Sequence, residues 1–196
     1  AVAAPAKAAG LDLIFVTNGQ INAGPAGDLA SVIAAVNVDL KCFSHKSYRA
    51  ILGGDLDASL RCIQTLHRAG VWVEVTTLVI PGFNDSAEEL AAIASFICGM
   101  DAEIPWHVSA FHPAWKWQHL PATDAASLRN ARKIGVAAGL RNVYTGNIPG
   151  DGGEKTRCPQ CGDMLIDRTG FRVNALNTQN GCCANCGRRL AGTGFP

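Results

Sequence analysis

The chain lacks the features that would mark a membrane, secreted or nucleic-acid-binding protein. Its 196 residues hold no run of about 18 apolar residues, so no transmembrane helix is expected. The first ten residues have neither the basic start nor the apolar stretch of a signal peptide. A formal net charge of +1 gives no electrostatic argument for nucleic acid or an anionic membrane as a partner. The 48% of hydrophobic residues suit one domain with a real core and a small appendage.

Strand-like and helix-like stretches alternate through residues 11–148. Because there is no initiator methionine and residues 1–10 resemble the last turns of a helix ending at Gly10, we expect the chain to begin inside a fold; a trimmed or tagged chain is the alternative. Strands are expected at residues 11–17, 36–41, 71–80, 106–111 and 142–145. Helices are expected at 29–35 after Asp28, at 57–69, from the capping signature of Ser86 and Glu89 to Cys98, and at 123–138. This pattern predicts a parallel α/β sheet, and since a full eight-fold barrel needs about 250 residues, a partial barrel or open sheet.

A glycine-rich stretch, residues 146–154, separates this part from a tail of different composition. In the tail, residues 165–167 and 171–173 flank Arg168-Thr169-Gly170 as the strands of a hairpin would. We therefore divide the chain into a partial βα barrel at residues 1–149 and a cysteine-rich module at residues 150–196.

Five of the eight cysteines lie within residues 158–186. Cys158 and Cys161 form one C-x2-C pair, Cys183 and Cys186 form another, and each pair is followed by glycine. Four thiolates presented in this way suit one structural Zn2+, with a rubredoxin-like iron or no metal as alternatives. Cys182 is the second choice as a ligand beside Cys183. Paired knuckles favour metal in a reducing cytosol, so we expect a cytoplasmic protein.

Residues 36–41 alternate strictly, which places Asn37, Asp39 and Lys41 on one face of a strand and three apolar residues on the other. In a parallel strand covered by helices, the polar face must point into the barrel. Polar groups at the carboxyl end of a barrel strand are typical of an active site. The alternative is an internal Asp–Lys ion pair with a structural role only.

Polar residues also lie within the neighbouring strands or at their ends. They are Thr17 and Asn18, Glu74 and Thr76, His107 and Ser109, and His112. A satisfied internal carboxylate at Glu74 and a hydrogen-bonded core histidine at His107 remain alternatives to a binding role. Residues 113–121, which include two tryptophans, either line a pocket or pack as a compact loop.

Five segments carry a resemblance to a known family: FVTNG (15–19), VNVDLK (36–41), VWVEVTTLVIPGFNDS (71–86), PWHVSAFHP (105–113) and TRCPQCG (156–162). In this order they resemble the radical S-adenosylmethionine (SAM) enzymes of the AmmeMemoRadiSam system, relatives of pyruvate formate-lyase activase. The resemblance implies an incomplete (βα)6 radical-SAM-type barrel with a zinc-ribbon-like tail. It also implies a [4Fe-4S] cluster on a C-x3-C-x2-C loop and reductive cleavage of SAM to a 5′-deoxyadenosyl radical that abstracts hydrogen. A glycyl-radical-type protein, or partner proteins of that system, would be the targets.

The resemblance to the activase also implies roles for single residues. Asp39 would help to form a cation and ribose site, while Lys41 and His112 would contact SAM, as suits a cation and a donor facing a carboxylate. Thr17 and Asn18 would belong to the same cofactor and cation site. The acidic residue that the activase has before this threonine is replaced by Val16, so the cation would lack one ligand.

The cluster motif C-x3-C-x2-C occurs nowhere in the chain. Cys42, Cys62 and Cys98 are scattered, and three thiolates from one loop are needed to hold the family's cluster. We therefore expect a C-terminal fragment of a radical SAM enzyme that lacks two βα units, is inactive as given, and has an open sheet edge. Two other functions stay open: a Schiff-base lyase using Lys41, and a non-catalytic binding module with structural zinc.

Overall fold

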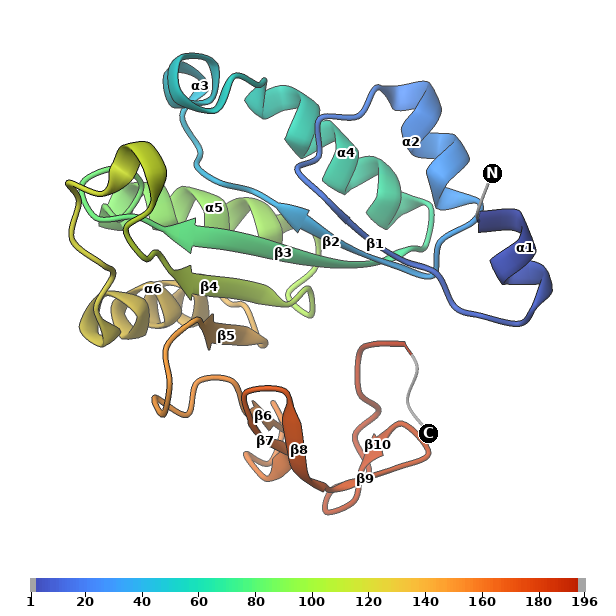
Figure 1. The fold of residues 1–196 in the computed structure, drawn as a ribbon. Coiled ribbons are helices and arrows are strands. Elements are labelled where there is room, and N and C mark those ends of the chain that lie inside the picture. Colours follow the sequence, from blue (N-terminus) through green and yellow to red (C-terminus); the bar gives the residue numbers. More distant parts are fainter. Residues whose placement is uncertain (1–2, 194–196) are drawn as a thin grey trace.

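The computed structural model describes residues 3–193 as a five-stranded sheet with helices, followed by a small β-rich tail (Figure 1). The strands are β1 (Ile14–Thr17), β2 (Ala35–Asp39), β3 (Trp72–Val79), β4 (Trp106–Ala110) and β5 (Val143–Gly146). They lie in chain order and all neighbours are parallel. The helices are α1 (Ala3–Ala8), α2 (Ala23–Ala30), α4 (Leu56–Arg68), α5 (Ala87–Met100) and α6 (Ala125–Ala137). Three shorter elements follow β2 and β4: α3 (His45–Ser47), the π-helical turn η1 (Tyr48–Leu52) and the 3-10 turn η2 (Trp115–Trp117).

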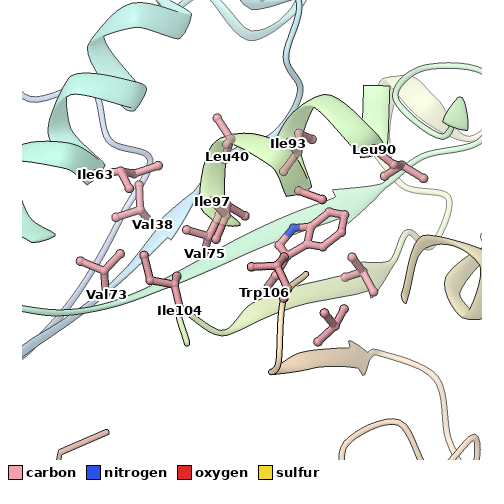
Figure 2. Packing of buried hydrophobic residues seen from close by; sticks show 14 of the residues in the cluster. Val38, Leu40, Ile63, Val73, Val75, Leu90, Ile93, Ile97, Ile104 and Trp106 are labelled. Carbon is pink, nitrogen blue, oxygen red and sulfur yellow. The ribbon is translucent and has the colours of Figure 1, made fainter. Parts of the chain in front are cut away.

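The core lies where the helices pack on the apolar face of the sheet. Figure 2 shows Ile93 and Ile97 of α5 beside Val75 and Trp106, and all four side chains are fully buried. The one polar atom of the Trp106 ring is satisfied, since its Nε1 donates to Thr77 Oγ1 at 3.0 Å. Burial of such large side chains contributes about 1.5–3 kcal/mol each, so this face holds the sheet together. Within residues 3–193, no helix has both the length and the apolar character needed to cross a bilayer.

The predicted α/β partial barrel is confirmed, and one predicted helix is wrong. A helix was expected at residues 29–35 with Asp28 as its cap, but α2 occupies Ala23–Ala30 and its N-cap is Asn22. Pro25 fits there because the first turn of a helix needs no amide hydrogen. Residues 34 and 35 instead donate to the carbonyl of Leu13, which brings β2 alongside β1. The other four helices and the five strands of the sheet match their predicted positions, with ends displaced by up to three residues in the strands and two in the helices; Ala1 and Val2 lie outside the described residues.

The tail contains the predicted hairpin, formed by β7 (Met164–Thr169) and β8 (Arg172–Leu176), with β6 (Thr156–Arg157) pairing on the other side of β7. A second pair, β9 (Thr178–Gln179) and β10 (Cys182–Cys183), follows. Its buried core is small and consists of Cys158, Leu165 and Cys183. So few apolar residues cannot stabilise a module by burial alone.

The glycine-rich stretch before the tail is tied to β5. The hydroxyl of Thr145 donates to the Asp151 carboxylate at 2.7 Å, and the amide of Gly153 donates to the same carboxylate at 2.8 Å. A Cβ at Gly153 would lie 1.8 Å from Thr145 Oγ1, so only glycine fits this approach. The division of the chain near residue 150 stays a prediction.

Candidate functional site

The face of the sheet opposite the core carries the polar side chains expected from the alternation in β2. Residues paired across parallel strands share a face. One row across this inner face contains Asp39, Thr76, His107 and Tyr144, and the row before it contains Asn37 and Glu74. The Thr76 hydroxyl donates to Asn37 Oδ1 at 2.9 Å, which links the two rows.

Asp39 and Lys41 form an ion pair at the carboxyl end of β2. Lys41 Nζ lies 2.8 Å from Asp39 Oδ2, and the two side chains are 34% and 28% exposed. The backbone of Lys41 is fixed on both sides, because its carbonyl accepts from Asn84 Nδ2 at 2.6 Å and its amide donates to the Tyr48 hydroxyl at 3.3 Å. The pair is therefore held on a rigid segment yet remains within reach of solvent.

Glu89 adds to this support in a way that the sequence did not show. Ser86 caps α5 by accepting from the Glu89 amide at 3.1 Å, as its capping signature predicts. The Glu89 carboxylate, however, accepts from the amide of Phe43 rather than completing a capping box. It thereby anchors the segment that follows Lys41.

The other residues predicted for a cofactor site lie at strand ends along the same edge. Thr17 pairs with Val38, so its register places it on the core side of the sheet, and its hydroxyl accepts from the Gly19 amide at 3.1 Å. Asn18 Oδ1 accepts from the Gln20 amide at 3.1 Å. His112 Nε2 lies 3.0 Å from the Asn147 carbonyl oxygen. No hydrogen bond or ion pair within residues 3–193 joins His112 to Asp39 or Lys41.

Glu74 and His107 form a second pair on the inner face. His107 Nε2 lies 2.7 Å from Glu74 Oε2, and the Trp72 indole donates to Glu74 Oε1 at 3.1 Å. Tyr144 stacks on the His107 ring with 5.3 Å between centroids and 23° between planes. Burial alone would raise the pKa of Glu74, but hydrogen bonds from His107 and Trp72, with the charges of His107 and Arg168, hold it below its usual value. Burial raises the pKa of Tyr144, so its hydroxyl stays protonated.

A cavity of about 1090 Å3 lies between this pair and the tail. Its sheet side includes Glu74, His107 and Tyr144, and its tail side includes Arg157 and Arg168. The Tyr144 hydroxyl and Thr156 Oγ1 are 3.1 Å apart, and Arg188 of the tail pairs with Glu103 at 2.7 Å. The tail is thus docked on the barrel by direct contacts. His112 and Asn147 also line the cavity, which therefore adjoins the carboxyl edge.

The four cysteines of the two knuckles come together in the tail. The sulfurs of Cys158, Cys161, Cys183 and Cys186 all lie within 4.8 Å of one another. The Cys158–Cys186 and Cys161–Cys183 separations are 3.6 and 3.7 Å. Four sulfurs at 2.3 Å from one tetrahedral metal would be about 3.8 Å apart, whereas a disulfide needs about 2.05 Å. The group can therefore hold a metal ion; Cys182 is not among the cysteines that meet within the described residues.

The ionisation of these thiols also suits a cation. Burial alone would raise the pKa of Cys158, but amide and thiol hydrogen bonds, chiefly from Cys161 and Gln160, lower it to about 6. The amide of Arg188 alone would lower the pKa of Cys186, but burial and the three neighbouring thiols raise it to about 12. Four sulfurs this close cannot all ionise without a positive charge between them, and a bound metal supplies that charge.

No protein-family model matches the chain. An uncharacterized protein of Methanocaldococcus jannaschii is 34% identical over 188 residues, which cover 94% of this chain and 56% of that protein. The chain thus spans little more than half of that relative.

Solved structures show the fold. A domain of pyruvate-formate lyase-activating enzyme from Bacteroides vulgatus superposes with a TM-score of 0.61 at 13% identity, covering 72% of this chain and 84% of that one. SuiB of Streptococcus suis, in a structure bound to SAM, superposes with a TM-score of 0.58 at 15% identity, covering 74% of this chain and 35% of that one. The chain therefore shares the partial-barrel fold of radical SAM enzymes.

Two residues that surround the Glu74–His107 pair, Tyr144 and Arg168, were not predicted from the sequence. Tyr144 occupies the second position of β5, as His107 does in β4, so alternation along that short strand could have indicated it. Arg168 lies in the hairpin of the tail, and no pattern in the sequence connects it with Glu74.

Proposed function

We propose that this chain is part of a radical SAM enzyme and that the carboxyl edge of its sheet binds SAM. The observation that carries the proposal is the Asp39–Lys41 ion pair, which stands at that edge on the polar face of a radical-SAM-type barrel. The pair lies within the segment VNVDLK (36–41), which, like FVTNG (15–19) before it, is one of the segments that carry the resemblance to radical SAM enzymes. Membership of the AmmeMemoRadiSam system, with its partner proteins, is part of the same proposal, as are a cytoplasmic location and a glycyl-radical-type target.

The residues of the edge have chemistry that fits SAM. Lys41 offers a cation for the carboxylate of SAM, and Asp39 offers acceptors for ribose hydroxyls or a cation. His112 adds a ring nitrogen at the end of β4, at present beside the Asn147 carbonyl. Asn84 and Tyr48 hold the Lys41 backbone, and Asp39 holds its ammonium group at 2.8 Å, so part of the site is formed before the ligand arrives.

The [4Fe-4S] cluster does not fit the cysteines of this chain. Cys42 and Cys62 are buried and Cys98 lies in α5, while the other five cysteines are Cys182 and the four clustered thiols of the tail. We propose that a segment outside this chain carries the cluster and adds to the sheet at β1. Ile14 and Val16 of β1 are 72% and 70% exposed, which is unusual for apolar residues on a sheet. When bound, the cluster would supply the electron for reductive SAM cleavage.

The structure gives a physical reason against the Schiff-base alternative. A lysine nucleophile must be a free amine, which requires a desolvated or cationic neighbourhood. Lys41 instead lies 2.8 Å from the carboxylate of Asp39 and keeps contact with solvent, so its surroundings are neither desolvated nor cationic. A binding module without chemistry remains the other candidate.

Calorimetric titration of the chain with SAM tests the proposed edge. One saturable site is expected, and Lys41→Ala should weaken binding by about 10-fold or more, as for loss of a charge-assisted hydrogen bond. Lys46→Ala is the matched control, because Lys46 is exposed on α3 nearby. Absence of SAM binding to the folded chain, or equal affinities for the Lys41→Ala and Lys46→Ala variants, would contradict the proposal and favour the binding module.

For the tail we propose a structural Zn2+ held by Cys158, Cys161, Cys183 and Cys186. All four positions of the tetrahedron are filled by protein, which leaves no open position for catalysis. Elemental analysis of the purified chain should show about one zinc per chain. A red protein with iron in that proportion would instead indicate a rubredoxin-like centre.

A further inference from the structure

We propose that the cavity between the sheet and the tail binds a small organic anion with an apolar body, held by Arg168 and Arg157 of the tail above the Glu74–His107 pair. The residues that carry this inference differ from those of the SAM edge, so it does not depend on the proposed function. The cavity of about 1090 Å3 is large enough for such a ligand, because ligand pockets typically measure about 300–1,000 Å3.

The charges of the cavity wall point to an anion. Glu103 is already paired with Arg141 and Arg188, and Glu74 is paired with His107.

Two arginines of the cavity wall, Arg157 and Arg168, differ from these paired groups. Within residues 3–193, neither Arg157 nor Arg168 forms a salt bridge; Arg157 donates only to the Gly162 carbonyl. Arg168 Nε is buried and has no hydrogen-bond partner there. A buried donor without a partner destabilises the fold, and an oxygen of a bound ligand would satisfy it. The one wall carboxylate outside an ion pair, Glu154, accepts from the Gly170 amide.

The rest of the wall suits an apolar or aromatic body. Trp72, Tyr144 and Pro105 come from the sheet side, and Phe171 comes from the tip of the β7–β8 hairpin, where it is fully exposed. Guanidinium groups bind planar carboxylates and phosphates with two parallel hydrogen bonds, so arginines beside aromatic rings select an anion with a flat body. His107, held by Glu74, presents its second ring nitrogen as a further polar contact.

A pair of dyes tests charge and shape separately. The probe is 8-anilinonaphthalene-1-sulfonate, an apolar anion, and the reference is N-phenyl-1-naphthylamine, which has the same body without the charge. In the metal-loaded chain, Arg168→Ala should weaken the anionic dye by about 10-fold and change the neutral dye by less than about 2-fold. Arg129→Ala, an exposed change on α6, is the control and should alter neither.

A second variant and an NMR measurement complete the test. If Arg168→Ala does not fold by circular dichroism, Arg157→Ala is used with the same expectation. Histidine NMR should show the anionic dye moving the signal of His107, which lines the cavity, and not those of His45, His67 or His119. Equal loss of both dyes, no loss in either variant, or an unmoved His107 signal would overturn the proposal. Failure of SAM to bind would leave these readings unchanged.

Discussion

Two pairs of ionisable side chains lie on the inner face of one sheet with similar exposure but different surroundings. Asp39 and Lys41, about a third exposed, belong to β2 and its carboxyl end, and Asn84 holds the Lys41 backbone there by a hydrogen bond. Glu74 and His107, 34% and 31% exposed, belong to β3 and β4 and face a cavity whose far wall is the tail. Since β3 alone separates β2 from β4, the pairs are only about 10 Å apart. The same alternating pattern thus produces two different sites, according to what covers each part of the sheet.

The largest expected effect comes from removal of the tail's metal, which should unfold the tail and leave the sheet folded. Replacing both Cys158 and Cys161 with Ser should release the metal and unfold residues 156–190, since structural zinc contributes about 10–16 kcal/mol to such modules at pH 7. Hydrogen exchange should rise there and remain slow in β2, β3 and β4. Cys182→Ser, outside the group of four, is the matched control and should keep its metal. One metal per chain in the double variant would show the ligand assignment to be wrong.

A change in the shared core should disturb both sites together. Ile93 is fully buried in α5 beside Trp106, so Ile93→Ala should lower the free energy of unfolding of the barrel by about 2–5 kcal/mol in a urea titration. The exposed Val136→Ala on α6 should cost far less. If Ile93→Ala removed the tail's metal while the barrel stayed stable, the separation of the two parts would fail.

The smallest expected effect distinguishes the Glu74–His107 pair by pH. Because the pKa of Glu74 is lowered in the folded state, its ionised form stabilises the fold above the unfolded value of about 4.3, and this stability is lost as pH falls below it. Glu74→Gln should therefore show a smaller fall in Tm than the parent chain between pH 6 and pH 3.5. The exposed Glu88→Gln should follow the parent curve. A parent-like curve for Glu74→Gln would mean that the pair does not stabilise the fold.

Much of this arrangement was predictable from the sequence, because it follows from alternation and spacing. The polar face of β2 and the meeting of the four knuckle cysteines depend on periods of two residues and on C-x2-C turns, which are local. The limits of α2 were not predictable in the same way. Asp28 is by itself a good N-cap for a helix over residues 29–35, and that helix is excluded only because the amides of residues 34 and 35 donate to the Leu13 carbonyl.

The cavity was beyond prediction for a different reason. Glu74, His107 and Arg168 come from three elements far apart in the chain, and their approach depends on how the tail docks. That docking rests on single contacts, such as Tyr144 with Thr156 and Glu103 with Arg188, which leave no periodic signal.

The most direct test of the account is a cross-titration of SAM and the anionic dye against Asp39→Ala and Arg168→Ala in the metal-loaded chain. Asp39→Ala is expected to weaken SAM binding by about 10-fold and to leave dye binding unchanged, while Arg168→Ala is expected to do the reverse. Loss of both ligands in either variant, with the fold intact, would contradict it and mean that the inner face holds one site.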